Sequence, residues 1–195
     1  MDIGYLMALF SILFGLVLGS FANVCIFRVP LGQSIVRPPS TCPQCGRRIK
    51  FYDNIPIVSY ILLKGKCRNC RHPISIQYPV VEAFFGLLSW ILLTRYGLSY
   101  QYFLFFLFTG VLVIVSVIDL HHKIIPDILS LPGIAAGFLA SFVPGSISWL
   151  DSLLGILAGG GALFLIALLF ERLTGREGMG GGDVKLLALI GAWMG

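Results

Sequence analysis

The sequence predicts an all-α membrane protein, a polytopic bundle of about six helical spans with one small polar loop domain. Three observations lead to this fold class. The 195 residues are 57% hydrophobic and only 12% charged, whereas soluble domains carry about 25% charged residues. Apolar runs long enough to cross a bilayer recur along the chain. The basic residues gather in one loop after the first run.

The apolar runs define the expected spans. The first, residues 5–27, lacks a basic flank and a small-residue cleavage site, so we expect a retained span and not a signal peptide. Further spans are expected at 79–95, 102–120, 128–144 and 150–170, and a sixth begins at 183. Only 13 residues of this sixth run are present, about 20 Å of helix. A bilayer core needs about 30 Å, so we expect the last span to be truncated.

The positive charges orient these spans. Eight of the fourteen Lys and Arg residues lie in the loop at 29–77 between the first two spans, at positions 37, 47, 48, 50, 64, 66, 68 and 71. The positive-inside rule places this loop in the cytoplasm and the N-terminus outside. The basic loops near 121–123 and 171–178 fall on the cytoplasmic side by alternation. The net charge of +5 therefore arises mainly from one loop. Anionic lipid headgroups would complement this charge, and no nucleic-acid partner is needed to explain it.

Four of the five cysteines form two CxxC pairs in that loop. CPQC covers 42–45 and CRNC covers 67–70, with 21 residues between the pairs. Four thiolates in this pattern, those of Cys42, Cys45, Cys67 and Cys70, are typical of a tetrahedral zinc site. Metal binding would supply the folding energy that so small a loop cannot obtain from a core. Two disulfides are the alternative, which a reducing cytoplasm disfavours. Cys25, in the first span, is expected to be a small buried hydrophobe.

The chain is therefore expected to have three parts. Residues 1–28 form the first transmembrane span, residues 29–77 the cytoplasmic zinc-binding loop, and residues 78–195 the remaining transmembrane helices. Glycine pairs with small-xxx-small spacing predict close packing between these helices: Gly15 with Gly19, Gly133 with Gly137, and Gly155 with Gly159.

Two of the nine acidic residues are distinctive as a pair. Asp119 lies at the cytoplasmic end of the third span and Asp183 at the cytoplasmic start of the sixth. Two independent helices thus place a carboxylate at the same membrane depth, and intramembrane acids usually face a bundle interior and mark function. Asp127, which follows Pro126, is expected to be the N-cap of the fourth span. Glu82, near the start of the second span, is a candidate cap for that helix.

Paired carboxylates of this kind are the catalytic device of aspartyl proteases. One carboxylate acts as a base toward a water, and the other donates a proton to the scissile carbonyl. The glycines before Asp183, residues 180–182, would let the backbone approach the site closely and line a wet cavity. We therefore expect Asp119 and Asp183 to be the catalytic residues of an aspartic endopeptidase.

Several motifs carry a family resemblance. The sequence GGGD at 180–183 fits the GxGD signature of intramembrane aspartyl proteases. More specific are GSFANVCIFRVP (19–30), the two CxxC pairs, DNIPIVSYILLKGKCRNC (53–70), ISIQYPVVE (74–82), DLHHKIIPDILSLP (119–132) and GMGGGDVKLLA (178–188). Together they make the chain resemble the type IV prepilin peptidases from residue 19 to residue 188.

The resemblance implies a bifunctional enzyme of the bacterial inner membrane. Such an enzyme removes the short basic leader of type IV prepilins and of the pseudopilins of type II secretion, usually cutting after a glycine. It then methylates the new N-terminal residue, typically Phe, with S-adenosylmethionine as methyl donor. The family's catalytic pair falls on Asp119 and Asp183, and its zinc ligands fall on the four CxxC cysteines. The glycine linked in the family to methyl transfer corresponds to Gly65.

Three other functions remain open at this point. An intramembrane aspartyl peptidase without methyltransferase activity is the nearest, because no local motif marks a site for S-adenosylmethionine. A transporter that relays protons through membrane carboxylates would leave the zinc loop unexplained. A membrane-tethered zinc module that binds nucleic acid would leave the paired aspartates without a role.

Overall fold

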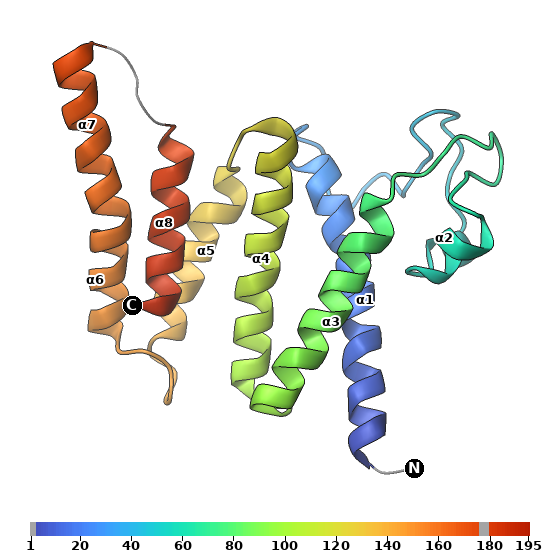
Figure 1. Ribbon diagram of the computed structural model, residues 1–195, viewed down its shortest axis with the longest axis horizontal. Coiled ribbons are helices and arrows are strands. Elements are labelled where there is room, and N and C mark those ends of the chain that lie inside the picture. The colour runs from blue at the N-terminus through green and yellow to red at the C-terminus, as the bar shows by residue number, and fades with distance from the viewer. Residues whose placement is uncertain (1–2, 176–179) are drawn as a thin grey trace. The chain divides into compact units, whose positions relative to one another are not determined.

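The computed structural model describes residues 3–175 and 180–195, and its described part is helical apart from turns and two isolated β-bridges (Figure 1). The helices are α1 (Ile3–Arg28), the 3-10 helix η1 (Phe51–Asn54), α2 (Val58–Leu62), α3 (Gln77–Tyr96), α4 (Tyr100–His122), α5 (Asp127–Ala140), α6 (Trp149–Ile156), the π-helical turn η2 (Leu157–Gly161), α7 (Ala162–Thr174) and α8 (Gly181–Met194). The predicted all-α class is confirmed.

Four helical stretches in the described part are long and apolar enough to cross a membrane. They are Gly4–Arg28, Gln77–Tyr96, Tyr100–His122 and the continuous run Trp149–Thr174. The expected span at 128–144 is shorter than predicted, because α5 ends at Ala140 after 14 residues. Turns follow it, and they include Pro144 and Gly145, which are poor at continuing a helix.

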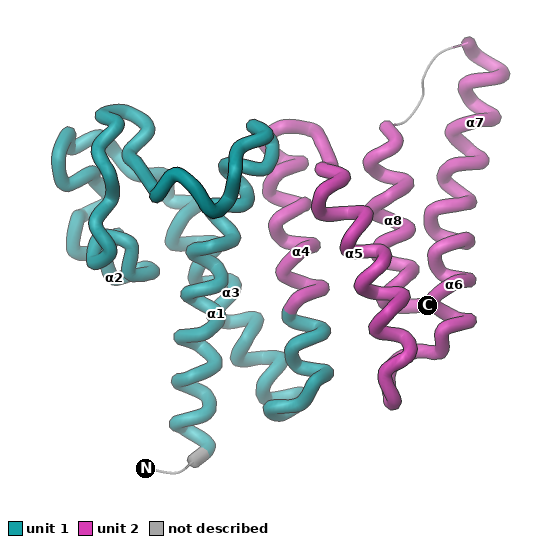
Figure 2. The backbone as a smooth tube through the Cα atoms, turned by 180° about the vertical axis from the view of Figure 1, so that it is seen from behind, with its two compact units in different colours: residues 1–106 teal, residues 107–195 magenta. Residues whose placement is uncertain are grey.

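The chain forms two compact units, residues 1–106 and residues 107–195, which divide α4 between them (Figure 2). In the first unit, α1 packs against α3 through small residues. A Cβ added to Gly15 would meet the carbonyl oxygen of Phe85, and one added to Gly19 would lie 2.8 Å from Cα of Glu82. The two backbones can approach this closely because these positions are glycines.

In the second unit, α8 packs between α5 and the α6–η2 segment. Leu189 and Trp193 of α8 fill the space left by Gly133 and Gly137, and Gly155 faces the backbone of Gly191. The expected glycine pairs therefore lie at helix contacts. This packing sets the position of α8, whose first turn carries Asp183.

Candidate functional site

The four CxxC cysteines come together in the first unit. Their sulfur atoms all lie within 4.8 Å of one another, and the group could hold a metal ion. All five cysteines of the chain are free thiols, and Cys25 is buried in α1, as expected.

The two CxxC pairs are held by hairpins of the same design. The N–H of Cys42 donates to the carbonyl of Arg47 at 2.9 Å, and the N–H of Cys67 donates to the carbonyl of His72 at 2.8 Å. Each hairpin closes with one antiparallel bridge, Thr41 with Arg48 and Lys66 with Pro73. Each thus presents two sulfurs on one tight turn, and the fold brings the turns face to face.

The sulfur geometry fits a tetrahedral metal. With a metal–sulfur distance of about 2.3 Å, the sulfurs of a regular tetrahedron lie about 3.8 Å apart, and Sγ of Cys42 lies 3.8 Å from Sγ of Cys70. Backbone N–H groups of Cys70 and Asn69 point at Cys67 and lower the pKa of its thiol to about 7. These N–H donors favour the thiolate, which is the form that binds metal.

Gly65 lies between α2 and the second hairpin. Its φ of +66° is a left-handed conformation that favours glycine, and an added Cβ would lie 3.0 Å from the hydroxyl of Tyr60. Its N–H donates to the carbonyl of Tyr60, and its own carbonyl accepts from Ile74. Gly65 therefore joins α2 to the cysteine hairpin by a turn that a larger residue would strain.

Asp119 and Asp183 both lie in the second unit. Asp119 is half-buried in the last turn of α4, and its carbonyl accepts the N–H of Lys123 at 2.8 Å. Asp183 is exposed in the first turn of α8. Figure 1 shows the end of α4, the start of α5 and the start of α8 at the same end of this unit. The sequence-predicted acids thus lie on helix ends at the same end of this unit.

Two contacts fix the start of α8 against the connection between α4 and α5. A Cβ on Gly182 would lie 3.0 Å from Cβ of Ile125, so this glycine permits a close approach, whereas Gly180 and Gly181 have open space around them. The ammonium of Lys185 lies 2.5 Å from a carboxylate oxygen of Asp127. The prediction that Asp127 is an N-cap is wrong: Pro126 is the N-cap of α5, and Asp127 is the first helical residue, turned toward α8.

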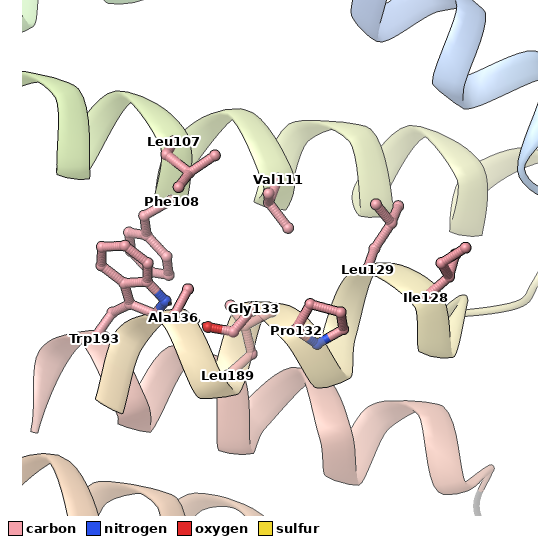
Figure 3. Close-up of a pocket in the computed structure, with 10 residues that line it drawn as sticks. All are labelled: Leu107, Phe108, Val111, Ile128, Leu129, Pro132, Gly133, Ala136, Leu189 and Trp193. Carbon is pink, nitrogen blue, oxygen red and sulfur yellow. Dashed lines mark hydrogen bonds between the residues drawn. The ribbon is translucent and has the colours of Figure 1, made fainter. Parts of the chain in front are cut away.

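An apolar cavity of about 190 Å³ lies among α4, α5 and α8 (Figure 3). Phe108 of α4 stacks on Trp193 of α8, with ring centroids 5.0 Å apart, at one end of the cavity. Ile128 and Leu129 of α5 lie toward the other end. Pro132, inside α5, also lines it. Asp119 and Asp183 therefore lie on two of the three helices that form its walls.

The sequence did not predict where the side chain of Glu82 lies or what it bonds to. Its carboxylate does not cap α3, whose N-cap, Ile76, has no side-chain hydrogen bond. Instead it accepts the N–H of Ile57 at 2.7 Å, across 25 residues of sequence. Among the described residues, Glu82 is the only acidic side chain that is buried. The feature of the sequence that could have indicated this buried position is a single acidic residue within an apolar run.

Comparison with known proteins identifies the family. Residues 13–96 match the Bacterial Peptidase A24 N-terminal domain, and residues 106–195 match the Type IV leader peptidase family. The chain is 36% identical over 217 residues to a prepilin leader peptidase/N-methyltransferase of Pseudomonas putida, covering all of this chain and 75% of that protein. The chain belongs to the prepilin leader peptidase/N-methyltransferase family.

Other members of this leader peptidase family also align over nearly all of this chain. The Pseudomonas aeruginosa protein of the same name is 39% identical over 95% of this chain and 72% of its own length. The Myxococcus xanthus protein is 40% identical over 98% of this chain, which spans 57% of that relative's length. No solved structure matches this chain significantly. The predicted resemblance is confirmed, and the enzyme class is that of the family.

Asp127 offers a matched test of the choice of catalytic acids in this leader peptidase. Asp127→Asn should keep leader cleavage within about fivefold of wild type, because Asp127 is 58% exposed and an exposed ion pair contributes at most about 1 kcal/mol. The cleavage rate of this variant is compared with that of wild type in the same membranes. An inactive Asp127→Asn beside an active Asp119→Asn would show that the wrong acid was chosen.

Proposed function

We propose that this chain removes the leader peptide of type IV prepilins or pseudopilins with Asp119 and Asp183, and then methylates the new N-terminus. The observation that supports the peptidase site is the position of the two acids: they lie on helix ends at the same end of one unit, in a chain whose relatives bear this name. The close approach of Gly182 to Ile125 would hold the start of α8 against the connection that follows α4.

The peptide bond would be cleaved by a water activated between the two carboxylates. The ionised carboxylate takes a proton from the water as its oxygen attacks the scissile carbonyl carbon. The protonated carboxyl donates to the carbonyl oxygen, and the resulting tetrahedral intermediate collapses when a proton passes to the leaving nitrogen. The products are a leader with a free carboxylate and a pilin with a free α-amine.

We propose zinc as the metal of the four-cysteine cluster. Four thiolates close the coordination shell, which is typical of a structural site and leaves no position for a substrate. Cys42, Cys45, Cys67 and Cys70 would hold the ion and fix the two hairpins on which Gly65 and α2 depend. The methyl group would come from the sulfonium of S-adenosylmethionine. The segment between α1 and α3 that carries both hairpins, residues 29–76, is called the cysteine module here. It would support this second reaction together with its Gly65.

The charge pattern supports a specific orientation in the inner membrane. The cysteine module carries most of the positive charge, so it and both aspartates would face the cytoplasm and the N-terminus would face outward. Arg47, Lys50 and Lys64 belong to that module, and anionic lipid headgroups would complement them.

Incubation of the purified protein with a prepilin and S-adenosylmethionine tests this function. Mass spectrometry of the pilin N-terminus should show loss of the leader and gain of one methyl group. A cleaved but unmethylated pilin would support a peptidase alone. An intact prepilin would exclude the peptidase and leave a transporter or a binding module.

A further inference from the structure

A buried polar cluster lies where the end of α1 meets the start of α3. Glu82 is 7% exposed, and its carboxylate accepts hydrogen bonds from the N–H of Ile57, at 2.7 Å, and from the hydroxyl of Ser20. Gly19 packs against the backbone of Glu82 from the opposite helix. Both donors are neutral, and burying a carboxylate without a cation is costly.

Asn23 adds a second acceptor to this cluster. It is 4% exposed, and its amide nitrogen donates to the carbonyl of Tyr78 at 3.0 Å. Its side-chain oxygen is buried and has no hydrogen-bond partner among the described residues. Tyr78 lies four residues before Glu82, so Asn23 contacts the turn of α3 that leads to Glu82. A carboxylate and an unpartnered amide oxygen beside one helical turn suit a cation that carries several N–H donors.

The bond between Ile57 and Glu82 involves a strained backbone. Ile57 has φ 59° and ψ −48°, a conformation that is an outlier for a β-branched residue. Ile57 is also the N-cap of α2, and Gly65 follows this helix by three residues. One short helix therefore connects the buried carboxylate to Gly65, which the proposed function places in the methyl-transfer part of the chain.

Building on the proposed function, we propose that Glu82 and Asn23 form the binding site for the α-ammonium of the newly cleaved pilin. The ammonium replaces the N–H of Ile57 at the carboxylate, and Asn23 accepts a second N–H. The Glu82 carboxylate then takes one proton and becomes a carboxylic acid, which leaves a neutral amine. The nitrogen lone pair attacks the methyl carbon of the sulfonium donor. A C–N bond forms, the S–CH₃ bond breaks, and its electron pair stays on sulfur as a neutral thioether.

Glu82→Gln separates this role from simple structural support. The glutamine oxygen can still accept from Ile57 and Ser20, so the local fold is preserved, but an amide does not accept the proton. With cleaved pilin and labelled S-adenosylmethionine, methyl transfer should fall at least about 100-fold, the usual contribution of a general base. Leader cleavage should stay within about twofold, because the aspartates lie in the other unit. Metal content and melting temperature should match wild type.

Ser59→Ala is the matched control for a loosened loop. Ser59 is buried in the same segment, where its hydroxyl accepts from the N–H of Ile55 and donates to the carbonyl of Tyr52. This variant should keep most methyl transfer. Glu82→Asp, which retains a carboxylate, should recover part of the activity that Glu82→Gln loses.

Three results would overturn the assignment. These are normal methylation by Glu82→Gln, equal losses in Ser59→Ala and Glu82→Gln, or no recovery in Glu82→Asp. A wild-type protein that cleaves without methylating would refute the methyl-transfer part of the proposed function together with this assignment. A methylating wild type beside an equally active Glu82→Gln would refute the assignment alone.

Discussion

Replacing either Asp119 or Asp183 by asparagine should abolish leader cleavage, with a rate loss on the order of 10⁴-fold. Either change removes the base or the proton donor, and the remaining carboxyl cannot perform both transfers. Groups that act as one unit have non-additive effects, so the double variant should be no slower than either single variant. The measurement is the initial rate of leader removal from a prepilin at equal amounts of inserted enzyme.

The controls for this experiment come from the same end of the second unit. Asp127→Asn changes an acid on the neighbouring helix and should remain active. Asp119 is half-buried and Asp183 is exposed, so neither substitution should unfold the protein. Additive losses in the double variant would contradict a shared catalytic unit. Equal activity of either single variant and wild type would exclude that residue from the chemistry.

Removing two zinc ligands, Cys42→Ser with Cys67→Ser, should unfold the cysteine module and impair methylation more than cleavage. Structural zinc contributes about 10–16 kcal/mol of apparent binding free energy in small domains, and each hairpin supplies half of the site. Wild type should carry about one zinc per chain and the double variant none. The test measures zinc by mass spectrometry, and cleaved and methylated pilin in the same membranes.

Cys25→Ala is the control, because Cys25 is buried in α1, away from the cluster. Gly65→Ala should keep the zinc and still lose methylation, since it strains the turn beside Tyr60 without removing a ligand. Wild-type protein without metal, with its thiols oxidised in pairs, would favour the disulfide alternative. Equal loss of both products in the cysteine variant would make the module a common support for the two reactions.

The helices and the cysteine cluster could be predicted because each rests on a local pattern. Apolar runs identify membrane-grade helices by length, and two CxxC turns need only be brought together to form a cluster. The glycine pairs likewise indicated packing surfaces, and Gly15 and Gly19 lie on the predicted one. The choice of Asp119 and Asp183 from topology placed both acids at one end of the second unit, and their catalytic role stays a prediction.

The remaining features depend on contacts between distant residues. Asp127 resembles a cap in sequence because it follows Pro126, but Lys185, 58 residues later, provides its partner. The hydrogen bond between Glu82 and Ile57 requires the loop to fold back onto α3, which no local pattern indicates. The early end of α5 depends on a turn at residues 141–146. An apolar run that continues to residue 143 conceals this turn.

The bond between Ile57 and Glu82 also determines how the cysteine module is attached to the membrane helices. Residues 29–76 connect α1 to α3, and 48 residues of flexible chain would have a root-mean-square reach of about 40 Å. The hydrogen bond to Glu82 fixes Ile57 near the middle of this segment and so divides one long connection into two shorter ones. Shorter tethers raise the effective concentration of the module at the helix pair. A movement of the hairpins would therefore reach α3 through this hydrogen bond as well as along the chain.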